Sequence, residues 1–280
     1  MSAPGPPPIV QHLGERARGS TIVHTARLAL DLPADPIELG RRVADRPGAA
    51  LLWDARPGGV AYLACDPVET FEAWDLEPSL PLARRGRSAD VARSAEAEVP
   101  RWIGVLPYEA ARDLERTAPD LRADPRALPL LAGPRWNRYA AVACVTDRVV
   151  VLADDDVSAR ELAGHLQGRA RSAPSRLELA EPVEADEVHK DRIRCALDLI
   201  GRGELYQVNL ARRFRLRAEG DLMGHLERLA RRTRAPYCAL LRLGATEVLS
   251  TSPELFLSLD GKGSLTTSPI KGTRPRGRML

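Results

Sequence analysis

Lysine and aromatic side chains are scarce in this sequence, and neither sign of charge dominates. Lysine occurs only at positions 190, 262 and 271 among 41 basic residues, and aromatic residues make up 4% of the chain. The formal net charge is only +3, because the arginines are interleaved with 38 acidic residues. A nucleic-acid-binding surface usually combines a basic stripe with stacking rings or a recognisable module. The composition therefore predicts no nucleic-acid partner.

Closely spaced cysteines and long apolar runs are also absent. The four cysteines, Cys65, Cys144, Cys195 and Cys238, lie far apart, which excludes zinc-type pairing in sequence and argues against a secreted disulfide scaffold. The first ten residues lack the basic start and apolar run of a secretory signal. No stretch approaches the length of a membrane helix, about 18 apolar residues. We therefore expect a cytoplasmic protein with reduced thiols and no membrane partner.

What is present is an ordinary globular composition, 44% hydrophobic and 28% charged, in a chain of 280 residues that can bury a sizeable core. Hydrophobic periodicity divides it into short helices and strands. We expect a helix from near Asp35 and Pro36, and further helices over 158–171, 186–200 and 221–233. The expected strands are 49–53, 60–65, the start of 102–116, a hairpin within 138–156, 204–217, 237–243, 246–259 and 264–271. The segment 102–116 is expected to continue as a helix after its apolar strand. This pattern predicts an α+β fold.

The strongest local signal is a hairpin formed by residues 251–259 and 264–272. The sequence Asp-Gly-Lys-Gly between these two segments favours a tight turn. If this four-residue loop closes directly, Leu259 faces Ser264. Pro269 disturbs regular strand pairing, so we expect a bulge or an edge position there.

The same register makes Glu254 and Lys271 diagonal neighbours on one face of the sheet, about 7–8 Å apart at Cα. A carboxyl group and an amine in this arrangement can serve as acid and nucleophile, or form a surface ion pair worth about 0–1 kcal/mol. Arg274 and Arg276 would disfavour a charged amine nearby, and a nucleophilic lysine must lose its charge. These arginines can equally belong to a solvated terminus, so both interpretations stay open.

Three motifs around this hairpin resemble those of the chorismate-utilising enzymes. They are residues 205–210 (LYQVNL), 252–254 (SPE) and 269–273 (PIKGT), and the segments 64–67 (ACDP) and 234–237 (RAPY) fit as well. The resemblance extends from about Leu51 to Arg276 and favours component I of the aminodeoxychorismate synthases. Anthranilate synthases, which the chain also resembles, carry alanine where this sequence has Lys271.

The resemblance implies a chorismate-utilising transferase with a covalent mechanism. The Lys271 amine would add to C2 of chorismate while Glu254, as general acid, protonates the departing C4 hydroxyl. Ammonia from a glutamine amidotransferase subunit would then enter at C4, giving 4-amino-4-deoxychorismate for para-aminobenzoate and folate synthesis. Gly272 and Thr273 match positions that contact chorismate in relatives. The alternatives are an anthranilate synthase component I-like enzyme and a non-catalytic truncated binding module.

A second site follows from the same resemblance. Pro236, Tyr237 and Cys238 match a segment that holds tryptophan in relatives, and Asp54 occupies the position of a motif serine. The change from serine to aspartate alters the chemistry of such a pocket. The alternative, that Pro236 and Tyr237 simply begin a core strand, therefore stays open beside tryptophan as a ligand.

The resemblance also sets the expected architecture. We predict antiparallel sheets with helices packed outside, part of the two-lobed chorismate-binding-enzyme fold. We expect a disordered tail at 1–8, an N-terminal α+β region of the component I family at 9–171, a linker at 172–185, and the first part of the catalytic domain at 186–280. Relatives continue with a segment that supplies the Mg²⁺ carboxylates. The sequence is therefore expected to be truncated and incomplete at its C-terminus, with Mg²⁺ required but no metal ligand among these residues.

Overall fold

The computed structural model describes residues 9–10, 26–72, 99–107, 134–170, 173–259 and 264–272. The expected tail at 1–8, the turn at 260–263 and Thr273 lie outside these residues. Among the described residues the chain forms four helices and antiparallel strands in four sheets, which agrees with the α+β prediction.

The largest element is a seven-stranded sheet, here called the core sheet, with the order β13-β12-β3-β4-β8-β9-β2 and antiparallel pairing throughout. Its strands are β2 (Ala26–Leu30), β3 (Ala50–Trp53), β4 (Ala61–Ala64), β8 (Ala141–Val145), β9 (Val149–Ala153), β12 (Tyr237–Leu243) and β13 (Thr246–Ser252). The hairpins predicted at 49–65 and 138–156 are confirmed as β3–β4 and β8–β9.

Both faces of the core sheet are covered, which explains the uninterrupted apolar runs in its central strands. In β9, Val149 and Val151 pack on one face, and Val150 and Leu152 pack on the other. The first face is covered by three helices: α1 (Pro36–Val43), α4 (Asp156–Gln167) and α6 (Leu222–Thr233). The helix expected near Asp35 is confirmed, because the Asp35 carboxylate caps α1 by accepting hydrogen bonds from the Ile37 and Glu38 amides.

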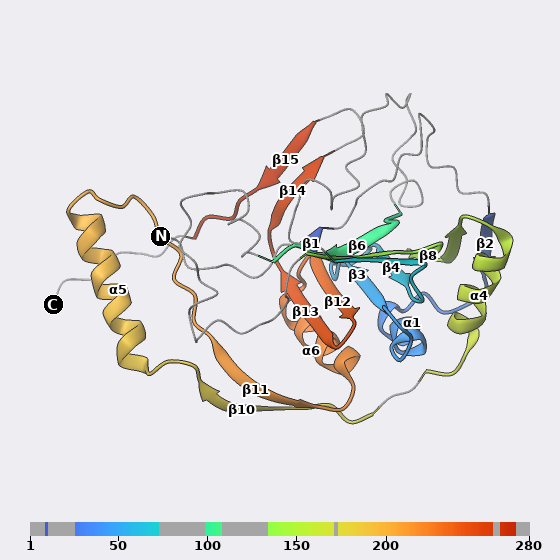
Figure 1. The fold of residues 1–280 in the computed structure, drawn as a ribbon, viewed down its shortest axis with the longest axis horizontal. Helices are drawn as coiled ribbons and strands as arrows, with labels where there is room; N and C mark the ends of the chain where they lie inside the picture. Colours follow the sequence, from blue (N-terminus) through green and yellow to red (C-terminus); the bar gives the residue numbers. More distant parts are fainter. Residues whose placement is uncertain are drawn as a thin grey trace.

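The second face is covered by a four-stranded sheet with the order β1-β6-β7-β5. Its strands are β1 (Ile9–Val10), β5 (Glu69–Glu72), β6 (Trp102–Val105) and β7 (Arg135–Arg138). Ile103 and Val105 of β6 pack against Val142 and Leu152 of the core sheet. The described core is thus a layer of helices, the core sheet and a smaller sheet (Figure 1).

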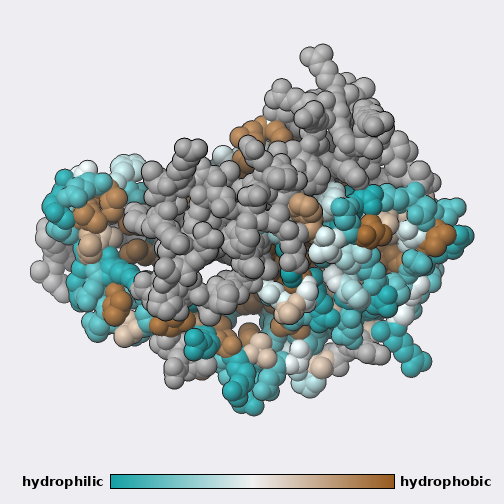
Figure 2. All heavy atoms as spheres, viewed as in Figure 1, coloured by the Kyte–Doolittle hydropathy of each residue, from teal (hydrophilic) through white to brown (hydrophobic). Residues whose placement is uncertain are grey.

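Five further elements lie outside these layers and are called the outer elements: β10 (Arg176–Pro182), α5 (Asp186–Gly201), β11 (Phe214–Glu219), β14 (Leu255–Leu259) and β15 (Leu265–Ser268). β10 pairs with β11, and β14 pairs with β15, each as a two-stranded sheet. Many apolar side chains of these elements are exposed, among them Leu197, Leu216 and Phe256. Figure 2 shows such apolar surface over the α5 end of the molecule.

Some local predictions are wrong in extent. The alternation over 204–217 predicts one strand, but regular structure begins only at Phe214, in β11. The strand expected over 246–259 is interrupted at Pro253 and Glu254 and forms β13 and β14. The expectation that the helices pack against the sheets fails for α5, because this helix buries only one residue, Ala196. Within the expected linker at 172–185, part of the chain forms β10. No described helix is long and apolar enough to cross a membrane.

Candidate active site

The β14–β15 hairpin carries the residues predicted for catalysis. Its pairs Ser258–Thr266 and Leu259–Leu265 differ by one residue from the predicted register near the turn, where Leu259 was expected to face Ser264. A register shift between Leu255 and Ser258 then brings Leu255 opposite Ser268, as the predicted register requires. The irregularity therefore lies on β14 and not at Pro269. Because of it, the open end of the hairpin has the expected alignment.

Glu254 and Lys271 lie at this open end, one residue before β14 and three residues after β15. The backbone around Glu254 is fixed by Ser252, whose hydroxyl donates to the Glu254 carbonyl at 3.1 Å and accepts from the Glu254 amide at 3.3 Å. Pro253, which has no amide hydrogen to donate to a strand ladder, lies between the end of β13 and Glu254. Both Glu254 and Lys271 are exposed, and neither forms an ion pair with a described residue.

Gly272, predicted to contact chorismate, follows Lys271 and is exposed. A Cβ added at this glycine would meet no heavy atom within 4 Å in the structure. The space that a side chain at position 272 would occupy is therefore open. Thr273, the other predicted contact, lies outside the described residues.

The residues predicted for a tryptophan pocket come together at one end of the core sheet. Cys238 pairs with Trp53 across β12 and β3, which brings the start of β12 beside the end of β3. The Ala55 amide donates to the Ala235 carbonyl at 3.0 Å and closes this end of the sheet. Asp54 is therefore a neighbour of the segment from Pro236 to Cys238. Pro236 and Tyr237 do lead into a core strand, as the alternative interpretation expects.

The Asp54 carboxylate is already engaged. Arg56 donates to its two oxygens from Nε at 2.9 Å and from Nη2 at 2.6 Å. Partial burial raises the pKa of Asp54, but the hydrogen bonds and charge of Arg56 lower it by more. The net pKa lies below the ordinary value, so the carboxylate is anionic at neutral pH. Burial, with a smaller effect from Asp54, raises the pKa of the Cys238 thiol to about 11. This thiol is consequently protonated, and it donates to the Ala235 carbonyl at 3.4 Å.

Two cavities are lined by described residues, and both lie away from these predicted sites. The larger, about 370 Å³, lies between α1 and the end of α4, and the smaller, about 110 Å³, lies beside the start of α6. Neither is lined by Glu254, Lys271 or Asp54. Among the described residues, the structure therefore places the predicted catalytic groups on an exposed hairpin.

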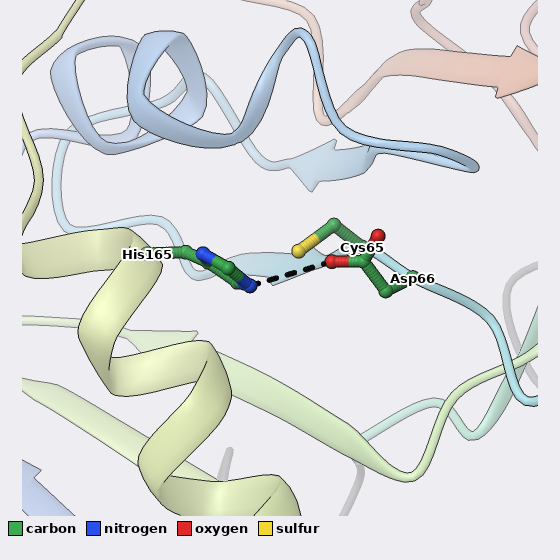
Figure 3. Close-up of side chains that lie close together, drawn as sticks. All are labelled: Cys65, Asp66 and His165. Atoms are coloured by element: carbon green, nitrogen blue, oxygen red, sulfur yellow. Dashed lines mark ion pairs between the residues drawn. The ribbon is translucent and has the colours of Figure 1, made fainter.

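One group of side chains was missed by sequence reasoning. Cys65 and Asp66 follow β4, His165 lies in the last turn of α4, and their ligand atoms all lie within 4.8 Å of one another (Figure 3). Burial is the main cause that raises the pKa of the Cys65 thiol, so the free thiol is protonated. The sequence holds only a weak signal for this group, an Ala-Cys-Asp-Pro segment after a strand, because His165 is remote in sequence.

The same group does not fit Mg²⁺, the metal that the resemblance implies. Mg²⁺ prefers an octahedral set of oxygen ligands, whereas this group offers a thiol, an imidazole and a single carboxylate. Among the described residues it is the one group of three or more side chains with suitable ligand spacing. This group therefore does not supply a Mg²⁺ site.

Comparison with known proteins identifies relatives over most of the chain. A family model described as chorismate binding enzyme matches residues 48–279. Anthranilate synthase component 1 1 of Haloarcula marismortui is 33% identical over 274 residues, covering 87% of this chain and 55% of that protein. Aminodeoxychorismate synthase component 1 of Salmonella typhimurium is 34% identical over 175 residues, covering 62% of this chain and 38% of that protein.

The chain spans about half the length of the curated relatives it matches, between 38% and 55% for these two proteins. Another aminodeoxychorismate synthase component 1, from Escherichia coli, is 30% identical over 177 residues, covering 62% of this chain and 38% of that protein. The identities to proteins with the two names are nearly equal. Sequence identity alone therefore does not separate an aminodeoxychorismate synthase from an anthranilate synthase.

Proposed function

The chain belongs to the chorismate-binding enzyme family, and we propose that it is component I of an aminodeoxychorismate synthase. One observation carries the choice within the family: a lysine, Lys271, occupies the PIKGT motif at the open end of the β14–β15 hairpin. The pairing of Leu255 with Ser268 aligns the segments that carry Glu254 and Lys271. An acid and a nucleophile on adjoining segments are the two groups that the reaction needs.

The first step forms a covalent bond to the enzyme. The neutral Lys271 Nζ adds to C2 of chorismate, the ring double bonds shift, and the C4–oxygen bond breaks. The Glu254 carboxyl group gives its proton to the departing hydroxyl, which leaves as water. The exposed positions of both residues and the open space beside Gly272 allow a dianionic substrate to approach this edge.

The second step releases the lysine. Ammonia adds at C4, the double bonds shift back, and the C2–Nζ bond breaks, which regenerates the free amine. The ammonium group formed at C4 then loses one proton, which restores the Glu254 carboxyl group. One chorismate and one ammonia thus give one 4-amino-4-deoxychorismate and one water. The relatives are named as component 1, and we propose a glutamine amidotransferase subunit as the partner that supplies ammonia here.

An anthranilate synthase component I-like activity is the second candidate. Its support is the alignment to the Haloarcula marismortui protein, which covers more of this chain than the alignments to the aminodeoxychorismate synthases. Lys271 argues against it, since an amine at this position opens the covalent route. A product assay separates the two activities, because anthranilate is fluorescent when it forms, whereas aminodeoxychorismate requires a separate lyase to become para-aminobenzoate.

The decisive experiment is to trap the covalent intermediate. The protein is incubated with chorismate in the absence of ammonia, and intact-mass and peptide-mass spectrometry locate any adduct. We expect an added mass of chorismate less one water, on the peptide that contains Lys271. Lys271→Ala should abolish this adduct, and ammonium chloride should remove it from the unmodified protein.

Lys190→Ala is the matched control, because Lys190 is an exposed lysine on α5 whose partner is Glu187 at 2.7 Å. This variant should keep the adduct. An adduct that persists in Lys271→Ala would reject the covalent role of this residue. Direct formation of anthranilate would favour the second candidate, and absence of both adduct and product would favour the non-catalytic binding module.

We propose that residues 9–171 form the N-terminal region, that 172–185 connect it to the catalytic region at 186–280, and that Mg²⁺ is required through ligands outside the described residues. Tryptophan binding beside Asp54 would need its ammonium group to compete with Arg56 for the carboxylate. Isothermal titration with tryptophan, repeated on Asp54→Asn, tests this site directly.

A further inference from the structure

A thiol, a carboxylate and an imidazole that the proposed chemistry does not use converge at one edge of the helical layer (Figure 3). The ligand atoms of Cys65, Asp66 and His165 lie within 4.8 Å of one another, and His165 Nε2 is 3.5 Å from Asp66 Oδ2. Figure 3 shows the three side chains pointing toward a common point, two from the end of β4 and one from α4.

The backbone explains how two adjacent residues reach one point. In a regular strand, successive side chains alternate between opposite faces. Asp66 departs from this geometry with a φ of 52°, which is uncommon for a residue with a side chain. Its amide is held by the Pro47 carbonyl at 2.8 Å, which fixes the turn. As a result, the Asp66 carboxylate lies beside the Cys65 thiol instead of opposite it.

We propose that Cys65, Asp66 and His165 form a binding site for a thiophilic divalent cation of the Zn²⁺ class. Sulfur, imidazole nitrogen and carboxylate oxygen are the three ligand types that Zn²⁺ takes in proteins. Three protein ligands leave one position of a tetrahedral site open. The cavity of about 370 Å³ is lined by His165 and Arg46, so water can fill that position.

The charges around the site accommodate a cation. Two of the four arginines that line the cavity beside it have acidic partners outside the site, since Arg41 pairs with Asp221 and Glu227, and Arg42 pairs with Glu38. His165 lies in the last turn of α4, where the helix dipole favours positive charge. Binding converts the Cys65 thiol to a thiolate and releases its proton to solvent, so charge and protons balance.

Arg46 is the competing group. Its Nε donates to Asp66 Oδ2 at 2.9 Å, on the oxygen that His165 also faces, and its side chain is 44% exposed. A bound cation must share the carboxylate with this guanidinium or displace it into solvent. Removal of the guanidinium should therefore strengthen cation binding, an effect that a purely structural role of the cluster would not produce.

Cobalt titration of the untagged, metal-free protein tests the site. Co²⁺ occupies Zn²⁺ sites and reports a thiolate ligand through a ligand-to-metal charge-transfer band. We expect one Co²⁺ per chain with this band, displacement by one Zn²⁺, and no displacement by Mg²⁺. Cys65→Ser should abolish the band, and His165→Ala should weaken Co²⁺ binding by more than the about 10–100-fold that loss of an outer-shell partner costs.

Cys195→Ser is the matched control, because Cys195 is an exposed free cysteine on α5, outside the cluster. It should leave the band unchanged, and Arg46→Gln should tighten binding without loss of the fold, as judged by circular dichroism. The proposal is overturned if the unmodified protein gives no saturable band, if the band survives in Cys65→Ser, or if Arg46→Gln weakens binding. Co²⁺ binding is measured without chorismate, so this test can fail while the proposed function holds, and the reverse.

Discussion

The core sheet and the outer elements differ in how far they bury their apolar side chains. Leu63, in β4 of the core sheet, is 0% exposed, whereas Leu259, in β14, is 63% exposed. Burial of a leucine contributes about 1.5–3 kcal/mol to folding, and an exposed one contributes little. Stability is therefore concentrated in the core sheet and its covering layers, while the outer elements depend on local interactions.

The same contrast separates scaffold from proposed chemistry. β14 and β15 form a two-stranded sheet, and an isolated sheet of this size is marginally stable in water. Lys271 follows that hairpin, whereas Glu254 lies between it and β13 of the core sheet, whose last residue, Ser252, fixes the Glu254 backbone. Segments with few buried contacts open at low free-energy cost. We therefore expect substitutions in the core sheet to reduce the free energy of unfolding, and substitutions in the outer elements to change it little.

The largest expected effect comes from a matched pair of leucines. Leu63→Ala should reduce the free energy of unfolding by about 2–5 kcal/mol, because it leaves a cavity in the packed core. Leu259→Ala should change it by no more than about 0.5 kcal/mol, because the side chain is already solvated. Urea unfolding of both variants, followed by circular dichroism, measures the two values. Equal losses would show that the outer elements share the packing of the core.

Alanine substitutions at two glycines should have the next largest effects, and they should change the stability of the fold in opposite directions. A Cβ at Gly104, in β6, would lie 2.2 Å from the Arg135 carbonyl oxygen, and this backbone atom cannot move aside easily. Gly104→Ala should therefore cost about 1–3 kcal/mol. Gly164, inside α4, has no heavy atom within 4 Å of an added Cβ. Gly164→Ala should stabilise the protein by about 0.4–1 kcal/mol, so the two melting temperatures should move in opposite directions.

The helices α6 and α5 differ in how their N-termini are capped. The Asp221 carboxylate accepts from the Met223 amide at 2.9 Å and caps α6 of the core layers. Asp221→Ala should cost about 1–2 kcal/mol, since it also removes the partner of Arg41. Ala185 occupies the N-cap position of α5 and forms no side-chain cap, although this residue has the extended backbone that a cap requires. Ala185→Ser should increase protection of the α5 amides in hydrogen exchange, and unchanged protection would contradict this prediction.

The sequence predicted the core sheet well because its signals are local. The apolar segments that form β8 and β9 are buried on both faces, and the turn between them lies at Thr146, Asp147 and Arg148. The hydrophobic pattern and the turn residues therefore predict the same hairpin. The segment 204–213 has equally clear alternation but does not form a strand. Tyr206 in that segment is 97% exposed. A strand requires a neighbouring strand, and alternation alone does not supply one.

The sites were harder to predict than the core sheet. The pairing of Leu255 with Ser268 agrees with the predicted register only because a register shift within β14 offsets a one-residue error near the turn, and the sequence predicted neither deviation. The cluster of Cys65 and His165 was not predictable, because it depends on how α4 packs on the core sheet. Residues distant in sequence are brought together by tertiary packing, which periodicity does not encode.

The smallest expected effect concerns pH and compares two ion pairs on helices. Burial raises the pKa of Glu227 in α6, but hydrogen bonds from Arg231 and Arg41 lower it to below its ordinary value of 4.5. Because the pKa is lower in the folded state, ionised Glu227 stabilises the fold above pH 4.5, and this contribution disappears as the pH falls through the folded pKa. Solvent screens these side chains, so the contribution should stay below about 1 kcal/mol.

Glu227→Gln should therefore reduce the loss of stability that acidification from pH 6 to pH 3 produces, as urea unfolding at each pH would measure. Glu187→Gln is the matched control, because Glu187 pairs with Lys190 at 2.7 Å on the exposed outer helix α5. Its slope with pH should match that of the unmodified protein, since unfolding of α5 contributes little to the global transition. A larger change in Glu187→Gln than in Glu227→Gln would place α5 inside the cooperative core and would contradict the division between the core sheet and the outer elements.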